Sequence, residues 1–202
     1  SDSQGFFKRS LIHSCVASDK SVSSNGWPTW CSEPFDVMSR GNPEKTYVMG
    51  IDPASEHDNF AIVILELHLE HQRVVFSWTT NKKDFAGRKK VGLTDTSDYY
   101  SFCARKIRDL IRLFPCVRIG IDSQGGGFTI AEGLRDLDKV KEGERPIYPI
   151  IEENKNKDTD DLAGDHILEL CNFAKADWTA NANHGMRKDL EDKVLLFPRF
   201  DT

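Results

Sequence analysis

The sequence predicts a single α/β domain built on a five-stranded mixed sheet, in which the first three strands run antiparallel and helices flank the sheet. Three observations predict this class. Three strand-like segments follow one another closely after residue 45, and a helical segment then separates them from a continuous apolar run at residues 117–121. The chain of 202 residues is 39% hydrophobic, which is enough to bury one sizeable core and favours one domain.

The first 45 residues differ in composition from the rest of the chain. They are rich in Ser, Asn, Gly and Pro, and they carry an early apolar patch and a W-P-T-W segment at residues 27–30. Hydrophobic periodicity is weak there, and exposed tryptophans would be poorly accommodated in a disordered tail. We therefore expect residues 1–45 to form an arm packed on a domain of residues 46–202, and the whole to be a soluble piece of a longer protein.

The next part of the chain reads as three strands. Residues 46–51, 60–67 and 73–80 are each rich in Val, Ile, Phe or Tyr. Their connections are too short for parallel crossovers, so the strands should form an antiparallel meander. A polar loop is expected at residues 81–93.

A helix and a central strand follow this meander. Apolar residues recur at helical spacing over residues 98–114, with Ser97 as a plausible N-cap and Pro115 as the stop. The unbroken apolar run at 117–121 is typical of a strand covered on both faces. Because a helix precedes it, this strand can pair parallel to the first one through a right-handed crossover.

The remaining elements alternate. We expect a helix at residues 128–138 and a strand at 146–151. Helical stretches at 165–176 and 183–193 are then expected, before a short apolar segment at 194–197. Three antiparallel strands followed by alternating helices and strands is the element order of the ribonuclease H-like fold.

Two of the predicted strands end in an aspartate. Asp52 ends the first apolar run and Asp122 ends the fourth. In the ribonuclease H-like arrangement these strands are parallel neighbours, so the two carboxylates would lie about 5 Å apart. Two charges at about 4 Å repel by about 4 kcal/mol at the effective dielectric of a protein surface. A cation between them would relieve that repulsion, and hard oxygen ligands favour magnesium or manganese.

A pair of such ions supports in-line hydrolysis of a phosphodiester bond. Two aspartates are too few to hold two ions, so a further acid is required. The alternative is purely structural: Asp52 would start an Asp-Pro turn, and Asp122 would cap the glycine-rich turn before a helix. Both interpretations stay open at the level of the residues.

The motifs around these aspartates resemble those of a known family. The segment G-I-D-P-A, with Asp58 a few residues later, looks like the first motif of the nuclease domain of viral terminase large subunits. The segment R-I-G-I-D-S-Q-G-G-G looks like its second motif, and residues 185–198 are similar to the segment before the last catalytic acid. The resemblance covers residues 46–202, and residues 1–45 look like the connection from a missing ATPase domain.

The resemblance implies an activity and a set of metal ligands. The expected activity is endonucleolytic cleavage of concatemeric double-stranded viral DNA during genome packaging, with two Mg²⁺ or Mn²⁺ ions. Asp52 and Asp122 carry over as catalytic ligands, and Asp58 as a secondary ligand, a water-orienting group or a turn residue. The third acid is Asp201 or lies beyond residue 202. The fallback candidates are Asp161, Asp165 and His166.

The resemblance also implies partners. These are DNA, the ATPase domain in the same chain, and the small subunit and portal as separate proteins, in the host cytoplasm or in the nucleus of a eukaryotic host. No membrane is implied, since no apolar run approaches the roughly 20 residues of a spanning helix. Basic side chains that are either DNA-backbone contacts or solvated loop residues are Lys82, Lys83, Arg88, Lys89, Lys90, Lys155 and Lys157. The net charge of −5 argues against bulk electrostatic coating of nucleic acid.

Two further patterns bear on the site. Gly125, Gly126 and Gly127 either bring backbone amides close to a phosphate or are glycines for steric reasons. The five cysteines are widely spread without a C-x-x-C pair, so neither a disulfide framework nor a zinc cluster is indicated. Cys103 and Cys171 fit the core faces of predicted helices.

Three competing functions remain. A Holliday-junction resolvase also has a first motif reading G-I-D-P, but such proteins begin near that strand. An actin-like or sugar-kinase ATPase needs a duplicated fold far longer than this chain. A catalytically inactive ribonuclease H-like module that only binds a partner is the third alternative.

Overall fold

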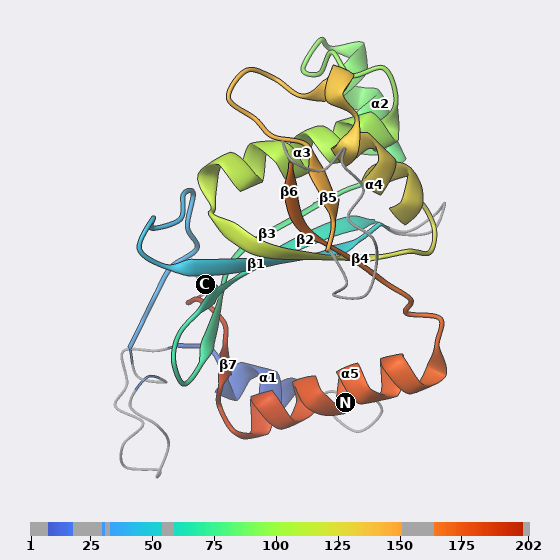
Figure 1. The fold of residues 1–202 in the computed structure, drawn as a ribbon. Helices are drawn as coiled ribbons and strands as arrows, with labels where there is room; N and C mark the ends of the chain where they lie inside the picture. The colour runs from blue at the N-terminus through green and yellow to red at the C-terminus, as the bar shows by residue number, and fades with distance from the viewer. Residues whose placement is uncertain (1–7, 18–29, 31–32, 54–58, 151–163, 200–202) are drawn as a thin grey trace.

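A computed structural model of the chain describes residues 8–17, 30, 33–53, 59–150 and 164–199. Its centre is a seven-stranded sheet with the order β5-β6-β4-β1-β2-β3-β7. Helices α3 and α4 cover one face, and α5 and the short α1 lie on the opposite side (Figure 1). No helix in the described part of the chain is long and apolar enough to cross a membrane.

The first three strands form the predicted antiparallel meander. They are β1 (Thr46–Asp52), β2 (Phe60–Leu67) and β3 (Gln72–Thr80). Each pairs with the next in antiparallel register. In β1, alternate residues are buried, so Tyr47, Met49 and Ile51 face the core while the residues between them face the other side.

The fourth strand and its two helices complete the main layer. β4 is Cys116–Asp122, α3 is Tyr99–Leu113 and α4 is Gly127–Arg135. The N-cap of α3 is Asp98, whose carboxylate accepts the backbone N–H of Ser101. The prediction of Ser97 was therefore wrong by one residue. A 3-10 turn, Leu137–Lys139, follows the end of α4, which is shorter than predicted.

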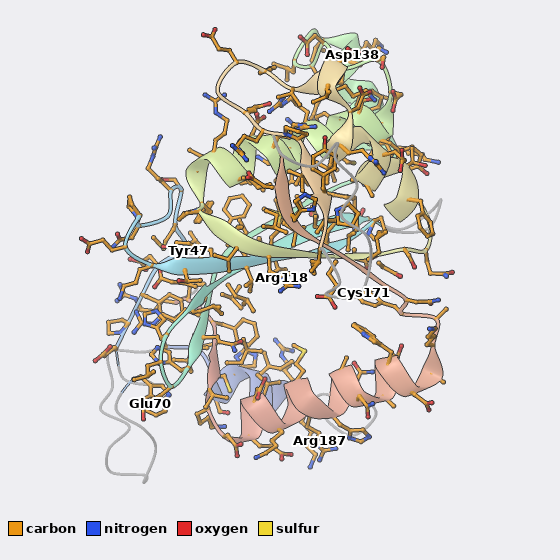
Figure 2. The ribbon with its side chains drawn as sticks, viewed as in Figure 1. Tyr47, Glu70, Arg118, Asp138, Cys171 and Arg187 are labelled. Carbon is orange, nitrogen blue, oxygen red and sulfur yellow. The ribbon has the colours of Figure 1, made fainter. Side chains whose placement is uncertain are left out.

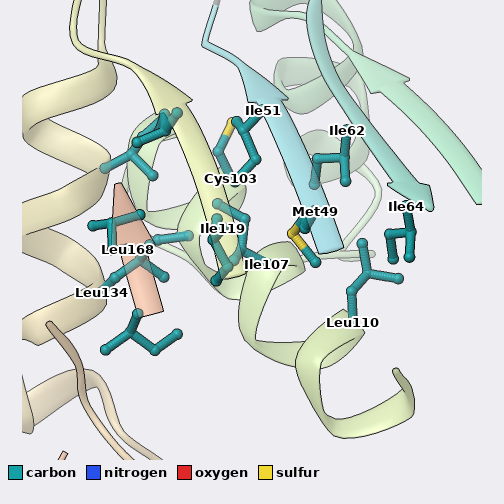
Figure 3. Close-up of a cluster of buried hydrophobic side chains, with 14 of the residues drawn as sticks. Met49, Ile51, Ile62, Ile64, Cys103, Ile107, Leu110, Ile119, Leu134 and Leu168 are labelled. Atoms are coloured by element: carbon teal, nitrogen blue, oxygen red, sulfur yellow. The ribbon is translucent and has the colours of Figure 1, made fainter. Parts of the chain in front are cut away.

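The core lies between this sheet and α3 and α4. Buried side chains from β1, β2, β4, α3 and α4, together with Leu168 from a further strand, interlock there, as Figure 3 shows for the residues that it labels. Fully buried members include Ile62, Ile107, Leu110, Ile119 and Leu134. The apolar strands were predictable for this reason: a central strand with one face in a core and the other under a helix carries few polar residues.

Two elements differ in type from the prediction. Residues 82–90, expected to be a loop, form helix α2 (Lys82–Lys90). Asn81 caps it by accepting the N–H of Asp84, and Phe85 packs against Tyr99 and Phe102 of α3. The Asn81 cap and the packing of Phe85 on α3 thus stabilise a helix that has no apolar face of its own.

The second difference is a strand where a helix was expected. Residues 165–171 form β6 (Asp165–Cys171), which lies between β4 and β5 and pairs in parallel with both. A short apolar run fits a strand or a helix equally well by periodicity, and here the pairing on both edges decides. β5 is Ile147–Pro149 and β7 is the two-residue Leu195–Leu196, so the sheet has seven strands and not five.

The C-terminal part packs with the arm. α5 (Ala176–Glu191) begins earlier than predicted and contacts α1 (Arg9–Ser14). A second buried cluster joins Cys15 to Leu190, Leu195 and Leu196. Trp30 donates its indole N–H to the carbonyl of Lys193 at 2.9 Å. Residues 9–17 and Trp30 therefore lie against the last helix and strand, whereas Met38 and Gly41 donate backbone hydrogen bonds to Val75 of β3 and Leu113 of α3.

The turn between β2 and β3 contains a pH-sensitive contact. The His71 ring stacks on Trp30 on one side and on His68 on the other. Burial, with His68 and Arg73 nearby, lowers the pKa of His71 to about 4 from its usual 6.5. Between these values the unfolded chain binds the proton first, so the fold should lose stability as pH falls through this window.

Replacing His71 with phenylalanine should flatten that pH dependence while keeping a ring between Trp30 and His68. Thermal melting at several pH values between about 6.5 and 4 measures it, since this is the window between the unfolded and folded pKa of the imidazole. The matched control is His184→Phe, because His184 is exposed on α5. Identical pH profiles for the His71 variant and the wild type would contradict the assignment.

Candidate functional site

The two strand-end aspartates lie side by side. β1 and β4 pair in parallel, as the element order predicts, with Gly50 opposite Gly120 and Ile51 opposite Ile121. The next residues, Asp52 and Asp122, therefore lie at the carboxyl ends of adjacent strands, which are about 4.8 Å apart. The side of the sheet formed by these strand ends is called here the aspartate edge. Since Ile51 and Ile121 are buried in the core, the two aspartates project from the opposite face of the sheet, toward the side of α5.

Asp122 is held by backbone groups. Only 9% of the residue is exposed, and its Oδ1 accepts the N–H of Gln124 at 3.1 Å and that of Phe173 at 3.3 Å. Both hydrogen bonds from described residues thus reach the same oxygen, which leaves Oδ2 for a ligand. Asp52 is exposed. One fixed and one exposed carboxylate provide the hard oxygen donors that Mg²⁺ and Mn²⁺ prefer.

The described residues do not complete a two-ion site. Within residues 8–17, 30, 33–53, 59–150 and 164–199, no three side chains of His, Cys, Asp or Glu gather where they could hold a metal ion. Asp58 and Asp201, the further acids suggested by the resemblance, lie outside the described residues, as does Asp161. The donor chemistry therefore fits a hard cation, with at least one ligand still to be supplied.

Two fallback ligands are excluded by their position. Asp165 and His166 begin β6, whose other end lies at the aspartate edge, because β6 runs parallel to β4. At about 3.3 Å per residue, Asp165 lies about 20 Å and His166 about 17 Å from that edge. There Asp165 pairs with Arg145 at 2.8 Å, and His166 Nδ1 contacts the carbonyl of Pro149. Their selection as alternative ligands was wrong because the segment is a strand.

The same strand brings an unpredicted thiol to the site. Cys171 is in register with Asp122, and Figure 2 shows it, together with Arg118, on the side of the sheet that faces α5. Its expected place on a helical core face was therefore wrong. Burial, and then the carboxylates of Glu169 and Asp122, raise the pKa of the Cys171 thiol. It stays protonated at neutral pH and is not the kind of ligand that a hard cation selects.

The glycine-rich turn after Asp122 is shaped by close packing. Gly125 has a φ of +60°, which favours glycine. A Cβ on Gly126 would lie 2.1 Å from the Tyr100 ring, and one on Gly127 would lie 1.8 Å from the carbonyl oxygen of Asp122. These contacts with protein atoms account for Gly126 and Gly127 in steric terms. They also place the first turn of α4 directly against Asp122.

The predicted basic cluster lies on α2. Because β3 runs in the same direction as β1, α2 begins at the aspartate edge, two strands from Asp52, or about 10 Å. A hydrogen bond of 3.0 Å from Asn81 to Asn59 ties the start of α2 to the segment before β2. The position is compatible with contact to a substrate backbone.

The five basic side chains of α2 are not equivalent. Arg88 is paired with Asp84, and Lys89 donates to the carbonyl of Ser97. Lys82, Lys83 and Lys90 are exposed, and none of the ion pairs among the described residues involves them. Lys155 and Lys157 lie outside the described residues. The cationic surface of α2 is therefore carried chiefly by three lysines.

A separate apolar groove lies away from the aspartates. It has a volume of about 670 Å³ and runs between α5 and the faces of β2 and β3. Its lining includes Leu65, Val74, Phe76 and Met186. Such a surface offers nothing to a phosphate, so it does not extend the carboxylate site.

Comparison with known proteins shows which solved structures share this fold. No family model and no curated protein sequence matches this chain. Among solved structures, the large terminase nuclease from thermophilic phage G20c is similar at 13% identity and a TM-score of 0.52, covering 82% of this chain and 64% of that one. The same nuclease with bound magnesium is similar at 12% identity and a TM-score of 0.52, with coverages of 80% and 62%.

A terminase from another phage gives the same result. The HK97 bacteriophage large terminase is similar at 16% identity and a TM-score of 0.50, covering 96% of this chain and 34% of that one. The chain thus spans less than two thirds of the length of each of these three structures. At such identities the similarity shows a shared fold, the ribonuclease H-like fold of large-terminase nucleases.

Proposed function

We propose that this chain is a metal-dependent DNA endonuclease that cleaves concatemeric double-stranded viral DNA during genome packaging. The single observation that carries the proposal is the juxtaposition of Asp52 and Asp122 at the ends of two paired parallel strands. The fold shared with large-terminase nucleases, one of them solved with bound magnesium, supports it. By the same likeness, the proposed partners are an ATPase domain in the same chain, a small subunit and a portal.

The roles of the residues follow from their surroundings. Asp122 is fixed by two N–H groups and would hold a cation through Oδ2, and the exposed Asp52 would contribute from the neighbouring strand. Asp58 and Asp201 are the proposed sources of the further ligands. Two Mg²⁺ or Mn²⁺ ions bound there would activate water and stabilise the leaving oxygen of the phosphodiester. The lysines of α2 would position the DNA backbone, since phosphate contacts supply most of the affinity for duplex DNA.

Cleavage of supercoiled plasmid in the presence of Mn²⁺ tests the proposal. The wild-type protein should nick and linearise the plasmid, and Asp52→Ala should not, because a ligand is lost. The control is Asp95→Ala, which removes another exposed aspartate from the segment before α3. Equal nicking by the wild type and Asp52→Ala would overturn the assignment and favour an inactive binding module or a contaminant.

The α2 lysines predict a specific salt dependence of DNA binding. Replacing Lys82, Lys83 and Lys90 with glutamine should reduce the slope of log K against log salt by about 0.9 for each phosphate contact removed, up to about 2.7 in total. Fluorescence anisotropy with duplex DNA, without divalent ions to prevent cleavage, measures the slope. Lys45→Gln is the control, since this exposed lysine precedes β1 at the opposite edge of the sheet. An unchanged slope in the triple variant would exclude α2 from the interface.

A further inference from the structure

Three aromatic side chains flank the aspartate edge. They are Phe128, Phe173 and Trp178, called here the aromatic rim. Phe173 donates its backbone N–H to Asp122 Oδ1 at 3.3 Å, and the Trp178 ring stacks on the Phe173 ring with centroids 4.3 Å apart. Phe128 follows Gly127, where an added Cβ would lie 1.8 Å from the carbonyl oxygen of Asp122. The rim is therefore connected to the candidate ligand from two directions.

The rim lies on both sides of the sheet edge. Phe128 is in the first turn of α4, on the side of the sheet that α3 covers. Phe173 precedes α5 and Trp178 lies in the first turn of α5, which is on the opposite side of the sheet (Figure 1). Asp122 lies at the edge between them. A DNA strand bound at Asp122 would lie next to Phe173, whose backbone N–H reaches the Asp122 carboxylate.

Packing of the fold does not account for these side chains. Phe128 is 61% exposed and Trp178 is 39% exposed. Among the described residues, the two buried hydrophobic clusters contain neither of them, nor do they contain Phe173. Large aromatic side chains usually contribute buried area to a core. An aromatic group left exposed beside a reactive edge points to a ligand with an aromatic face.

The backbone that carries Phe173 is firmly held. The Thr179 hydroxyl donates to the carbonyl of Phe173, Ala174 N–H donates to Asn172 Oδ1 at 3.1 Å, and Ser123 N–H donates to the carbonyl of Cys171 at 2.7 Å. The Phe173 and Trp178 pair is thus positioned before any ligand arrives. A preformed stacking surface binds with less loss of conformational entropy than a mobile one.

The chemistry beside the rim favours a nucleobase. Every base has a flat π face that can stack on an aromatic side chain without sequence preference. Lys175 is exposed, lies between Phe173 and Trp178 in the chain, and is suited to contact the phosphate of the same nucleotide. Bases inside an intact duplex are already stacked and paired, so only an unpaired base can reach such a surface.

We propose that the aromatic rim stacks on unpaired bases, so that this site takes its DNA strand from a frayed, gapped or locally melted duplex. The inference rests on the proposed nuclease function and specifies its substrate: a strand with at least one unstacked base next to the scissile phosphate. Phe173 and Trp178 hold that base, and Phe128 guides the strand from the opposite side.

Binding of labelled oligonucleotides tests the inference. Fluorescence anisotropy without divalent ions compares a single strand, a blunt duplex and a duplex with an unpaired end. The wild-type chain should bind the two forms with unpaired bases more tightly than the blunt duplex. Trp178→Ala should weaken binding of those two forms by about 5- to 150-fold, the range expected for one lost base–aromatic stack, while Trp178→Phe should retain most of the affinity.

Two further variants keep the test decisive. Phe128→Ala changes a residue of α4 and should also weaken binding of the DNA forms with unpaired bases. Because α4 is separate from α5, this loss would not come from a disturbed start of α5. Met186→Ala is the matched control, because Met186 is 39% exposed on the same helix as Trp178. It should bind like the wild type. Melting curves confirm that each variant is folded.

The outcomes separate this inference from the proposed function. Equal affinity of the wild type for paired and unpaired forms, or unchanged affinity in both alanine variants, would overturn the inference even where plasmid cleavage depends on Asp52. A change of self-association in Trp178→Ala, seen by size-exclusion chromatography without a change in affinity, would make the rim a protein contact and also overturn it. Selective binding of unpaired forms without cleavage would support base stacking on the aromatic rim and overturn the proposed nuclease function.

Discussion

Replacing Asp122 with asparagine should abolish the response of this protein to divalent ions while leaving the fold intact. The amide oxygen of asparagine can accept the same N–H groups of Gln124 and Phe173 that Oδ1 accepts. The variant therefore removes the negative charge without removing either hydrogen bond. A folding defect is not expected, so a lost activity can be assigned to the lost ligand.

Two measurements should change together in Asp122→Asn. If the site binds the ions as proposed, ions at about 100 times their dissociation constant should stabilise the wild type by about 2.7 kcal/mol. For a protein of this size that is an increase in Tm of about 5–10 °C, which the variant should lose. Cleavage should fall by more than about 100-fold, since even loss of a residue that only orients a ligand costs about 10- to 100-fold.

The control is Glu132→Gln, which makes the same change of charge on an exposed side chain of α4. It should keep the ion-induced increase in Tm and the cleavage activity. An Asp122→Asn protein that is still stabilised by Mn²⁺ would show that the ions bind elsewhere. The pairing of Asp52 and Asp122 would then have no functional meaning.

The proximity of Asp52 and Asp122 could be predicted from the sequence because it depends on only one long-range feature, the parallel pairing of their two strands. Apolar runs that stop at Asp52 and at Asp122 mark two strand ends, and the helix between the runs allows parallel pairing. Once these strands are neighbours, their last residues must share an edge. The apolar residues of β1 and β4 are visible in the sequence itself. Burial of these strands could therefore be predicted without knowing which distant residues they contact.

The rest of the site depends on β6, which the sequence does not define. Leu168 is buried while Ile167 is only partly so, and this short run fits a helix and a strand equally well. Its identity comes from hydrogen bonding to β4 and β5, which are distant in the chain. Cys171 and Phe173 reach Asp122 only through this pairing. Only Leu168, Glu169 and Leu170 alternate between apolar and charged residues, and three residues are too few to indicate a strand.

Helix α2 was missed for a related reason. Its composition is polar and basic, and it has no apolar face that periodicity could detect. The Asn81 cap and the contact of Phe85 with α3 stabilise it, and the second of these is a tertiary interaction. A sequence pattern can indicate a cap at Asn81, but it cannot indicate that Phe85 has a partner.

Replacing Gly127 with alanine should reduce the free energy of unfolding and disturb the proposed metal site at Asp122. The added Cβ would lie 1.8 Å from the carbonyl oxygen of Asp122, and that oxygen belongs to the backbone of a central strand. Either the start of α4 or the end of β4 must move. Overpacking of this kind costs about 1–3 kcal/mol, or about 2–12 °C in Tm.

A glycine on the same helix provides the matched control for Gly127→Ala. At Gly133 the added Cβ would meet only Ala104 Cβ, at an ordinary 3.5 Å. Alanine is also the better helix former by about 0.8–1.0 kcal/mol, so Gly133→Ala should be neutral or stabilising. Because movement of β4 displaces the Asp122 carboxylate, Gly127→Ala should also reduce the Mn²⁺-induced increase in Tm, which Gly133→Ala should retain. Equal melting temperatures and equal Mn²⁺ responses in the two variants would show that α4 does not position Asp122.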